Sequence, residues 1–107
     1  MDRASLEKVA AFAKAHDLIV IADEIYCDLT YEGQHTCFAS LPDMQERTIV
    51  LNGFSKSYAM TGLRIGYVCA PREALEEIYK VHQYEILCAS TTSSMVRSKH
   101  SEIVMMM

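Results

Sequence analysis

Two polar segments, each directly after an apolar run, carry the side chains best suited to chemistry. The first holds Asp23 and Tyr26, and the second holds Ser55, Lys56 and Arg64. If the two apolar runs are neighbouring parallel strands, both segments leave the sheet at its carboxyl edge, where open α/β sheets bind their ligands. The sequence thus predicts an amine, a carboxylate, a guanidinium and a phenol beside one crevice.

These groups are complementary to the parts of one cofactor. An amine in apolar surroundings can lose its proton near neutral pH and condense with an aldehyde. A guanidinium binds a phosphate through two nitrogen donors, a carboxylate pairs with a protonated pyridine, and a tyrosine hydroxyl donates to a phenolate. Pyridoxal 5'-phosphate contains all four partners. Each residue alone is more often an ordinary surface group, so the prediction rests on Asp23, Tyr26, Lys56 and Arg64 together.

Other phosphate and hydrolase motifs do not fit the sequence. The segment "GFSKS" has the glycine, lysine and serine of a nucleotide-binding loop, but such a loop needs one glycine directly before the lysine and another five residues earlier. Ser55 and Val50 stand at those positions. The chain also has no G-x-S-x-G hydrolase elbow and no G-x-G-x-x-G dinucleotide fingerprint.

Three apolar runs predict the strands that position these groups, at residues 17–23, 47–52 and 63–71. The first run is rich in β-branched residues and predicts a strand buried on both faces, as in a parallel sheet. Residues 24–47 are numerous enough for a crossover between parallel strands. Pro71 ends the third run.

Two amphipathic helices flank the predicted strands. Apolar residues at helical spacing between residues 6 and 13 predict the first, capped by Asp2 or Ser5 and ending near His16. The second begins at Pro71, and we interpret its apolar face as packing, with a satisfied, half-buried His82; that face comprises Leu75, Ile78, Tyr79, His82 and Ile86. The resulting order predicts an α/β fold with a short, mostly parallel sheet flanked by helices. Because three such strands make a thin core, we expect the chain to be part of a larger structure.

Composition excludes several classes of function. The chain has 107 residues, half of them hydrophobic, and a net charge of -4 without a basic run. We therefore expect one domain that binds neither nucleic acid nor an anionic membrane. Its apolar runs are too short to span a bilayer, and its first residues do not have the pattern of a signal peptide. A cytoplasmic location is the expectation.

The four cysteines, at positions 27, 37, 69 and 88, form no C-x-x-C pair. We expect reduced thiols that pack as small side chains. Cys27, His35 and Cys37 do not have the spacing of a common zinc site, so no metal is predicted.

The segments "ADEIY" and "TIVLNGFSKSYAMTGLRIGYV", followed by "HQY", resemble the class I/II aminotransferases of fold type I, over about residues 5–90. The resemblance implies that residues 1–90 are the central part of the large domain of a pyridoxal-phosphate-dependent transferase. It also implies that the first two strands are parallel and the third antiparallel. Residues 91–107 depart from the family pattern, as a truncation or a frameshift would produce.

The resemblance also implies roles for individual residues. Lys56 is similar to the lysine that bonds covalently to the cofactor and then moves a proton. Asp23 is similar to the aspartate that keeps the pyridine nitrogen protonated, and Tyr26 to the tyrosine that bonds the phenolic oxygen. Arg64 resembles the phosphate-binding arginine, and Ser55 is a further candidate for the phosphate site.

The activity implied is transfer of an amino group from an amino acid to a 2-oxo acid by a homodimeric enzyme of amino-acid metabolism. Two alternatives stay open: another fold type I enzyme, such as a lyase or a decarboxylase, and a non-catalytic remnant. Family members are several times longer, and this sequence lacks their phosphate-cradling loop, ring-stacking aromatic residue and substrate-binding arginine. Since orientation by many contacts supplies much of the rate, we expect little activity from these residues alone.

Overall fold

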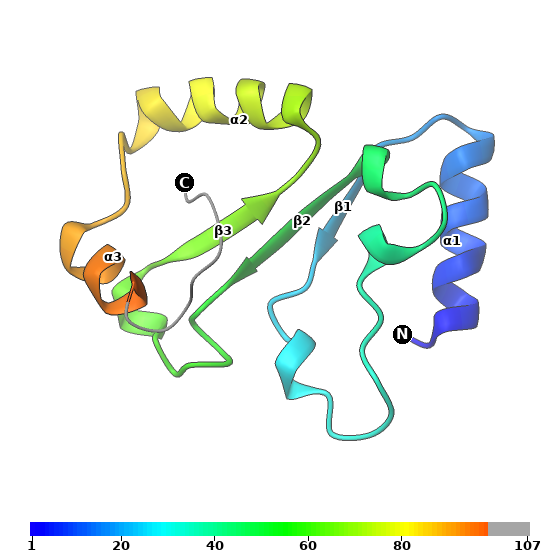
Figure 1. Cartoon of the computed structure of the whole chain (residues 1–107), viewed down its shortest axis with the longest axis horizontal. Coiled ribbons are helices and arrows are strands. Elements are labelled where there is room, and N and C mark those ends of the chain that lie inside the picture. Colours follow the sequence, from blue (N-terminus) through cyan, green and yellow to red (C-terminus); the bar gives the residue numbers. More distant parts are fainter. Residues whose placement is uncertain (99–107) are drawn as a thin grey trace.

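The computed structural model of the chain describes residues 1–98, which form a three-stranded sheet with helices around it (Figure 1). Short 3-10 turns connect several of the elements. The helices and strands are α1 (Arg3–Ala15), β1 (Val20–Asp23), β2 (Thr48–Gly53), β3 (Gly66–Cys69), α2 (Arg72–Glu85) and α3 (Thr91–Ser98). None of these helices is long and apolar enough to cross a membrane.

The sheet has the order β1-β2-β3 and is mixed. β1 runs parallel to β2, with Asp23 opposite Leu51. β3 runs antiparallel to β2, with Gly66 opposite Gly53. The α/β class and the strand directions implied by the resemblance are therefore confirmed. β1 and β2 end at the same edge, as the prediction of a shared crevice requires.

Helix α1 forms where the apolar periodicity predicts it. The Asp2 carboxylate caps the helix by accepting the backbone N–H of Ser5 at 2.7 Å, and this bond lowers the pKa of Asp2. Ala10 and Ala13 are buried on the face that points to the sheet. They pack with Phe38, Leu41 and Met44, from the segment between β1 and β2, in the main core cluster.

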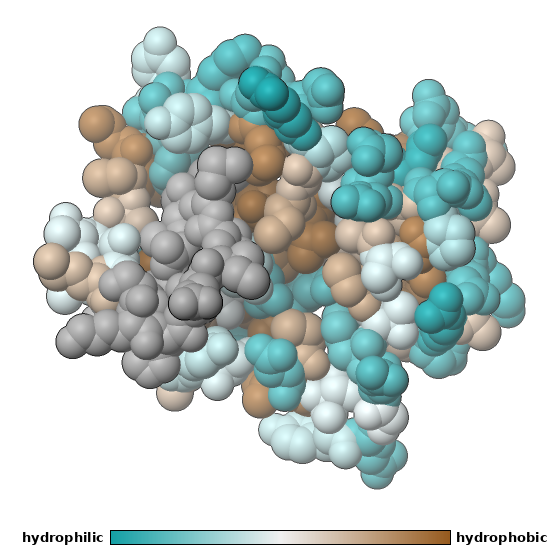
Figure 2. Space-filling view, viewed as in Figure 1, coloured by the Kyte–Doolittle hydropathy of each residue, from teal (hydrophilic) through white to brown (hydrophobic). Residues whose placement is uncertain are grey.

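One prediction about β1 is wrong, because this strand is covered on one face only. Val20 and Ala22 pack against the core beneath α1. Ile21, on the opposite face, is 66% exposed, and the preceding Ile19 is 69% exposed. Figure 2 also shows apolar side chains at the surface in the middle of the molecule, between α2 and the region of α1. The sheet thus has an apolar face that residues 1–98 leave partly uncovered.

Helix α2 is present as predicted, but its apolar face is only partly covered. Leu75, Ile78 and His82 are half-buried, whereas Tyr79 and Ile86 are exposed. The His82 Nε2 atom is buried and has no hydrogen-bond partner in the part of the chain that is described. The expectation of a satisfied histidine is therefore not met.

Helix α3 was not predicted. Its Ser93 is buried, and the hydroxyl donates to the backbone oxygen of Leu63 at 2.6 Å. This contact fixes Ser93, in the segment predicted to depart from the family pattern, against the turn before β3. The rest of that segment, residues 99–107, lies outside the described residues.

Candidate active site

The end of β1 places an acidic side chain at the carboxyl edge of the sheet. Asp23 is the last residue of β1 and is exposed. One of its oxygens, Oδ1, accepts the backbone N–H of Ile25 at 3.2 Å. The next residue, Glu24, continues the pairing of the strands, because its N–H donates to the backbone oxygen of Leu51 at 2.9 Å. Asp23 is therefore held at the sheet edge by its own turn and by β2.

The segments that follow β1 and β2 meet through Lys56 and Tyr26. The Lys56 Nζ atom lies 5.8 Å from the centroid of the Tyr26 ring, a cation–π distance. Two residues that the sequence placed in one crevice are thus brought together. The apolar surroundings expected for Lys56 are not found, because both Lys56 and Tyr26 are exposed.

The loop from Phe54 to Ile65 carries the other predicted residues. The half-buried Ser55 contributes its backbone oxygen, which accepts the Thr61 hydroxyl at 2.9 Å and so closes the loop. Arg64, at the far end, has left-handed backbone geometry with φ 50°. Its Nη1 atom donates to the backbone oxygen of Thr61 at 3.1 Å, and no other hydrogen bond or ion pair holds this guanidinium within residues 1–98. Among residues 1–98, no hydrogen bond joins Arg64 to Lys56.

Asn52 joins the ends of the two parallel strands. Its Nδ2 atom donates to the Cys27 sulfur at 3.2 Å, and its Oδ1 atom accepts the N–H of Gly53 at 2.7 Å. Cys27 is therefore a packed thiol beside the strand end, as expected for an ordinary cysteine. Within residues 1–98, no group of three histidine, cysteine or acidic side chains could hold a metal ion.

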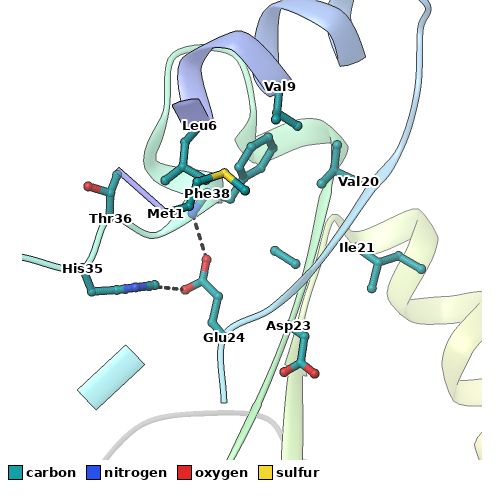
Figure 3. A pocket seen from close by; sticks show the side chains of 11 residues that line it. Met1, Leu6, Val9, Val20, Ile21, Asp23, Glu24, His35, Thr36 and Phe38 are labelled. Carbon is teal, nitrogen blue, oxygen red and sulfur yellow. Dashed lines mark hydrogen bonds and ion pairs between the residues drawn. The ribbon is translucent and has the colours of Figure 1, made fainter. Parts of the chain in front are cut away.

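Glu24 is a structural residue of the site that sequence reasoning missed. Its side chain is only 10% exposed and bonds to two residues far along the chain (Figure 3). Oε1 accepts the backbone N–H of Phe38 at 2.8 Å, and Oε2 accepts from His35 Nε2 at 3.0 Å. These two bonds hold the irregular segment between Tyr26 and Phe38 against the end of β1. An acidic residue directly after an apolar run was the available signal, but its partners could not be read from the sequence.

The same carboxylate affects the neighbouring thiol. Burial raises the pKa of Cys37, and the nearby Glu24 carboxylate raises it further. The Cys37 thiol is therefore protonated at neutral pH. Cys27 and Cys37 are half-buried, as expected of small packed side chains, whereas Cys69 and Cys88 are exposed, which corrects that expectation for these two.

Replacing Glu24 by alanine is expected to cost about 1–3 kcal/mol of stability, because the Phe38 N–H loses its acceptor in a partly buried place. Glu24→Gln is expected to cost less, since an amide oxygen can still accept this N–H. Urea unfolding measures both, and limited proteolysis between residues 27 and 37 reports opening of the loop. Glu32→Ala, at an exposed glutamate of the same loop, is the matched control. If all three variants behaved like the parent chain, Glu24 would not close the loop.

Comparison with known proteins identifies the family of this chain. The family model described as aminotransferase class I and II matches residues 1–101. An aspartate aminotransferase of Pyrococcus abyssi is 47% identical over 92 residues, which are 85% of this chain and 24% of the relative. An aromatic-amino-acid aminotransferase of Thermococcus litoralis is 41% identical over 92 residues, with the same coverage of both chains.

Solved structures agree with this assignment. A Pyrococcus protein called protein-A1 superimposes with a TM-score of 0.88 at 43% identity, covering 92% of this chain and 26% of that one. An aromatic aminotransferase from Pyrococcus horikoshii gives a TM-score of 0.85 at 41% identity, covering 95% and 28%. The chain thus spans about a quarter of the length of these proteins. On sequence and fold together, it belongs to the class I and II aminotransferase family.

Proposed function

We propose that this chain forms part of an enzyme that uses pyridoxal 5'-phosphate to move an amino group from an amino acid to a 2-oxo acid. The observation that carries the proposal is the meeting of Lys56 with Tyr26 at the ends of two parallel strands, one of which ends at Asp23. The relatives support it, because they are named as aminotransferases of aspartate and of aromatic amino acids. We further propose that the whole enzyme is a cytoplasmic homodimer.

The side chains present fit this cofactor. Lys56 has no hydrogen-bond or carboxylate partner among the described residues, so its amine is available to an aldehyde. Asp23 uses one carboxylate oxygen in its own turn and keeps the other for a pyridine nitrogen. Arg64 uses one nitrogen locally and keeps the rest of its guanidinium for a phosphate. The chemistry of this donor set matches the cofactor group by group.

Each residue then has a defined task. When bound, the cofactor supplies a ring that accepts electrons from the substrate. Asp23 would hold the pyridine nitrogen protonated through its second carboxylate oxygen, and the Tyr26 hydroxyl would donate a hydrogen bond to the ring oxygen. Arg64 binds the phosphate, with Ser55 as a further donor. Lys56 Nζ anchors the cofactor and afterwards takes up and returns the proton at the substrate carbon.

Selective labelling of Lys56 is the expected result that tests this proposal. The purified chain is mixed with pyridoxal phosphate, reduced with borohydride and mapped by mass spectrometry. We expect Lys56 to carry the added mass at least about tenfold more than Lys8, Lys14, Lys80 or Lys99, because neighbouring groups bind the rest of the cofactor.

Two variants make the labelling result decisive. Lys56→Arg is expected to remove the selective label. Lys80→Arg is the matched control, since Lys80 is bonded to Glu77 on α2 and is not a proposed ligand. Equal labelling of all lysines, with no difference in Lys56→Arg, would contradict a cofactor site in this chain.

A further inference from the structure

The backbone of Arg64 has a conformation that its surroundings must hold. Its φ of 50° and ψ of 51° lie in the left-handed region. Residues with a Cβ atom rarely adopt this region and keep it only where the surrounding structure fixes them. Arg64 directly follows the 3-10 turn Thr61–Leu63. Because the peptide bond is planar, the Leu63 carbonyl and the Arg64 N–H turn together. A group that holds this carbonyl therefore also restricts φ at Arg64.

The hydroxyl of Ser93 holds that carbonyl. It donates to the Leu63 oxygen at 2.6 Å, from a residue 30 positions further along the chain. The last carbonyl of a helical turn has no partner within the turn, so Ser93 supplies a missing donor. Ser93 is only 4% exposed, and a hydrogen bond made away from water is costly to lose, because a buried group is then left unpaired. Figure 1 shows α3, which carries Ser93, next to this turn.

The loop that Ser93 contacts also carries the groups proposed to bind the cofactor. The Arg64 Nη1 atom donates to the backbone oxygen of Thr61 at 3.1 Å. The Thr61 hydroxyl donates in turn to the backbone oxygen of Ser55 at 2.9 Å, and Lys56 is the next residue. The guanidinium is thus linked within the loop to the segment that bears the amine. The bond from α3 acts on the other end of this linkage, at the backbone of Arg64.

We propose that Ser93 is a positioning residue for the phosphate contact of Arg64. By holding the peptide between Leu63 and Arg64, its hydroxyl sets the direction in which the guanidinium leaves the loop. A guanidinium binds a phosphate best through two parallel N–H donors, which requires a defined orientation. Without the hydroxyl the peptide can turn, and Arg64 then faces the phosphate in only a fraction of the molecules. This inference rests on the proposed function, and it adds a side chain from α3 to the candidate site.

Two probes that differ only in the phosphate test this role. The full chain is incubated with increasing amounts of pyridoxal 5'-phosphate or of pyridoxal, which has the same ring and aldehyde but no phosphate. Borohydride reduction and mass mapping give the concentration of each probe that half-labels Lys56, and each variant is compared with the parent chain for the same probe. Ser93→Ala removes the hydroxyl, whereas Ser93→Thr keeps it. Ser94→Ala makes the same change one residue further along α3 and leaves the bond from Ser93 to Leu63 in place.

In Ser93→Ala we expect the half-labelling concentration to rise about tenfold for pyridoxal 5'-phosphate and to stay within about twofold for pyridoxal. Ser93→Thr and Ser94→Ala are expected to behave like the parent chain with both probes. Arg64→Gln is expected to remove the advantage of the phosphate. Adding Ser93→Ala to Arg64→Gln is then expected to change nothing further, because both residues act on one contact.

The outcomes separate this inference from the proposed function. If the parent labels Lys56 selectively and Ser93→Ala responds to pyridoxal 5'-phosphate as the parent does, the inference is overturned and the proposed function stands. Equal losses with both probes also overturn the inference, because Ser93 would then only stabilise the fold, and so does a further loss on adding Ser93→Ala to Arg64→Gln. A parent chain without selective labelling contradicts the proposed function itself, and the inference with it.

Discussion

Replacing Met44 by alanine is expected to cost about 2–5 kcal/mol, a loss comparable to the whole stability of a small domain. Met44 is 0% exposed and packs with Ala10, Ala13, Phe38 and Leu41 in the main core cluster. Removing its side chain leaves a cavity between α1 and the segment that precedes β2. We expect a large fall in the urea midpoint, measured by far-ultraviolet circular dichroism.

Met44 also contacts the start of β2 through its backbone, a contact that Met44→Ala leaves in place. The backbone oxygen of Met44 accepts the hydroxyl of Thr48 at 2.7 Å, and Thr48 is itself buried. Val81→Ala is the control, since Val81 is 61% exposed on α2, and a change within about 0.5 kcal/mol is expected there. Equal losses in the two variants would mean that Met44 is not at the centre of the core.

The helices and strands that show a regular pattern of apolar residues within a short stretch of sequence were predicted. Apolar residues at helical spacing gave α1, and the Asp2 cap was among the two candidates named. The strands were also predicted, although β1 and β3 are shorter than their apolar runs. Helix α3 was missed because its serines and threonines are weak helix formers. What holds it is a contact between Ser93 and Leu63, thirty residues apart.

Burial was the property least accessible to sequence reasoning. Ile19 and Ile21 belong to a run that is typical of a strand covered on both faces, yet both are exposed. The run of apolar residues shows that the strand can pack on both faces. Whether its side chains are exposed depends on which other segments are present to cover them. The exposed Tyr79 and Tyr84 of α2, and Ile86 directly after this helix, fit the same explanation.

The part of the candidate site that depends on the direction of the strands was predictable from the sequence. The rule that ligands bind at carboxyl ends of strands was enough to place Lys56 near Tyr26. The role of Glu24 was not predictable, because its partners His35 and Phe38 lie 11 and 14 residues away along an irregular segment. Only the folded path of that segment brings them together.

Gly53→Ala is expected to destabilise the chain by about 1–3 kcal/mol, because the base of the loop that carries Lys56 has no room for a side chain. A Cβ atom at Gly53 would lie 3.0 Å from the backbone oxygen of Ile65 and 3.1 Å from the Cα of Gly66. Both are backbone atoms and cannot turn aside, so β2 and β3 must separate. Their separation would weaken the bond from the Phe54 N–H to the Ile65 oxygen, 3.4 Å long, which closes the loop.

Gly62→Ala is the matched control within the same loop, since a Cβ atom there would meet nothing within 4 Å. Urea unfolding gives the stability of both variants, and hydrogen exchange at the Phe54 amide reports whether the strands have separated. We expect faster exchange in Gly53→Ala only. If the two variants were equally stable, the close approach of β2 and β3 would not fix the loop. The placement of Lys56 and Arg64 would then depend on contacts within the loop, such as the bond from Thr61 to Ser55.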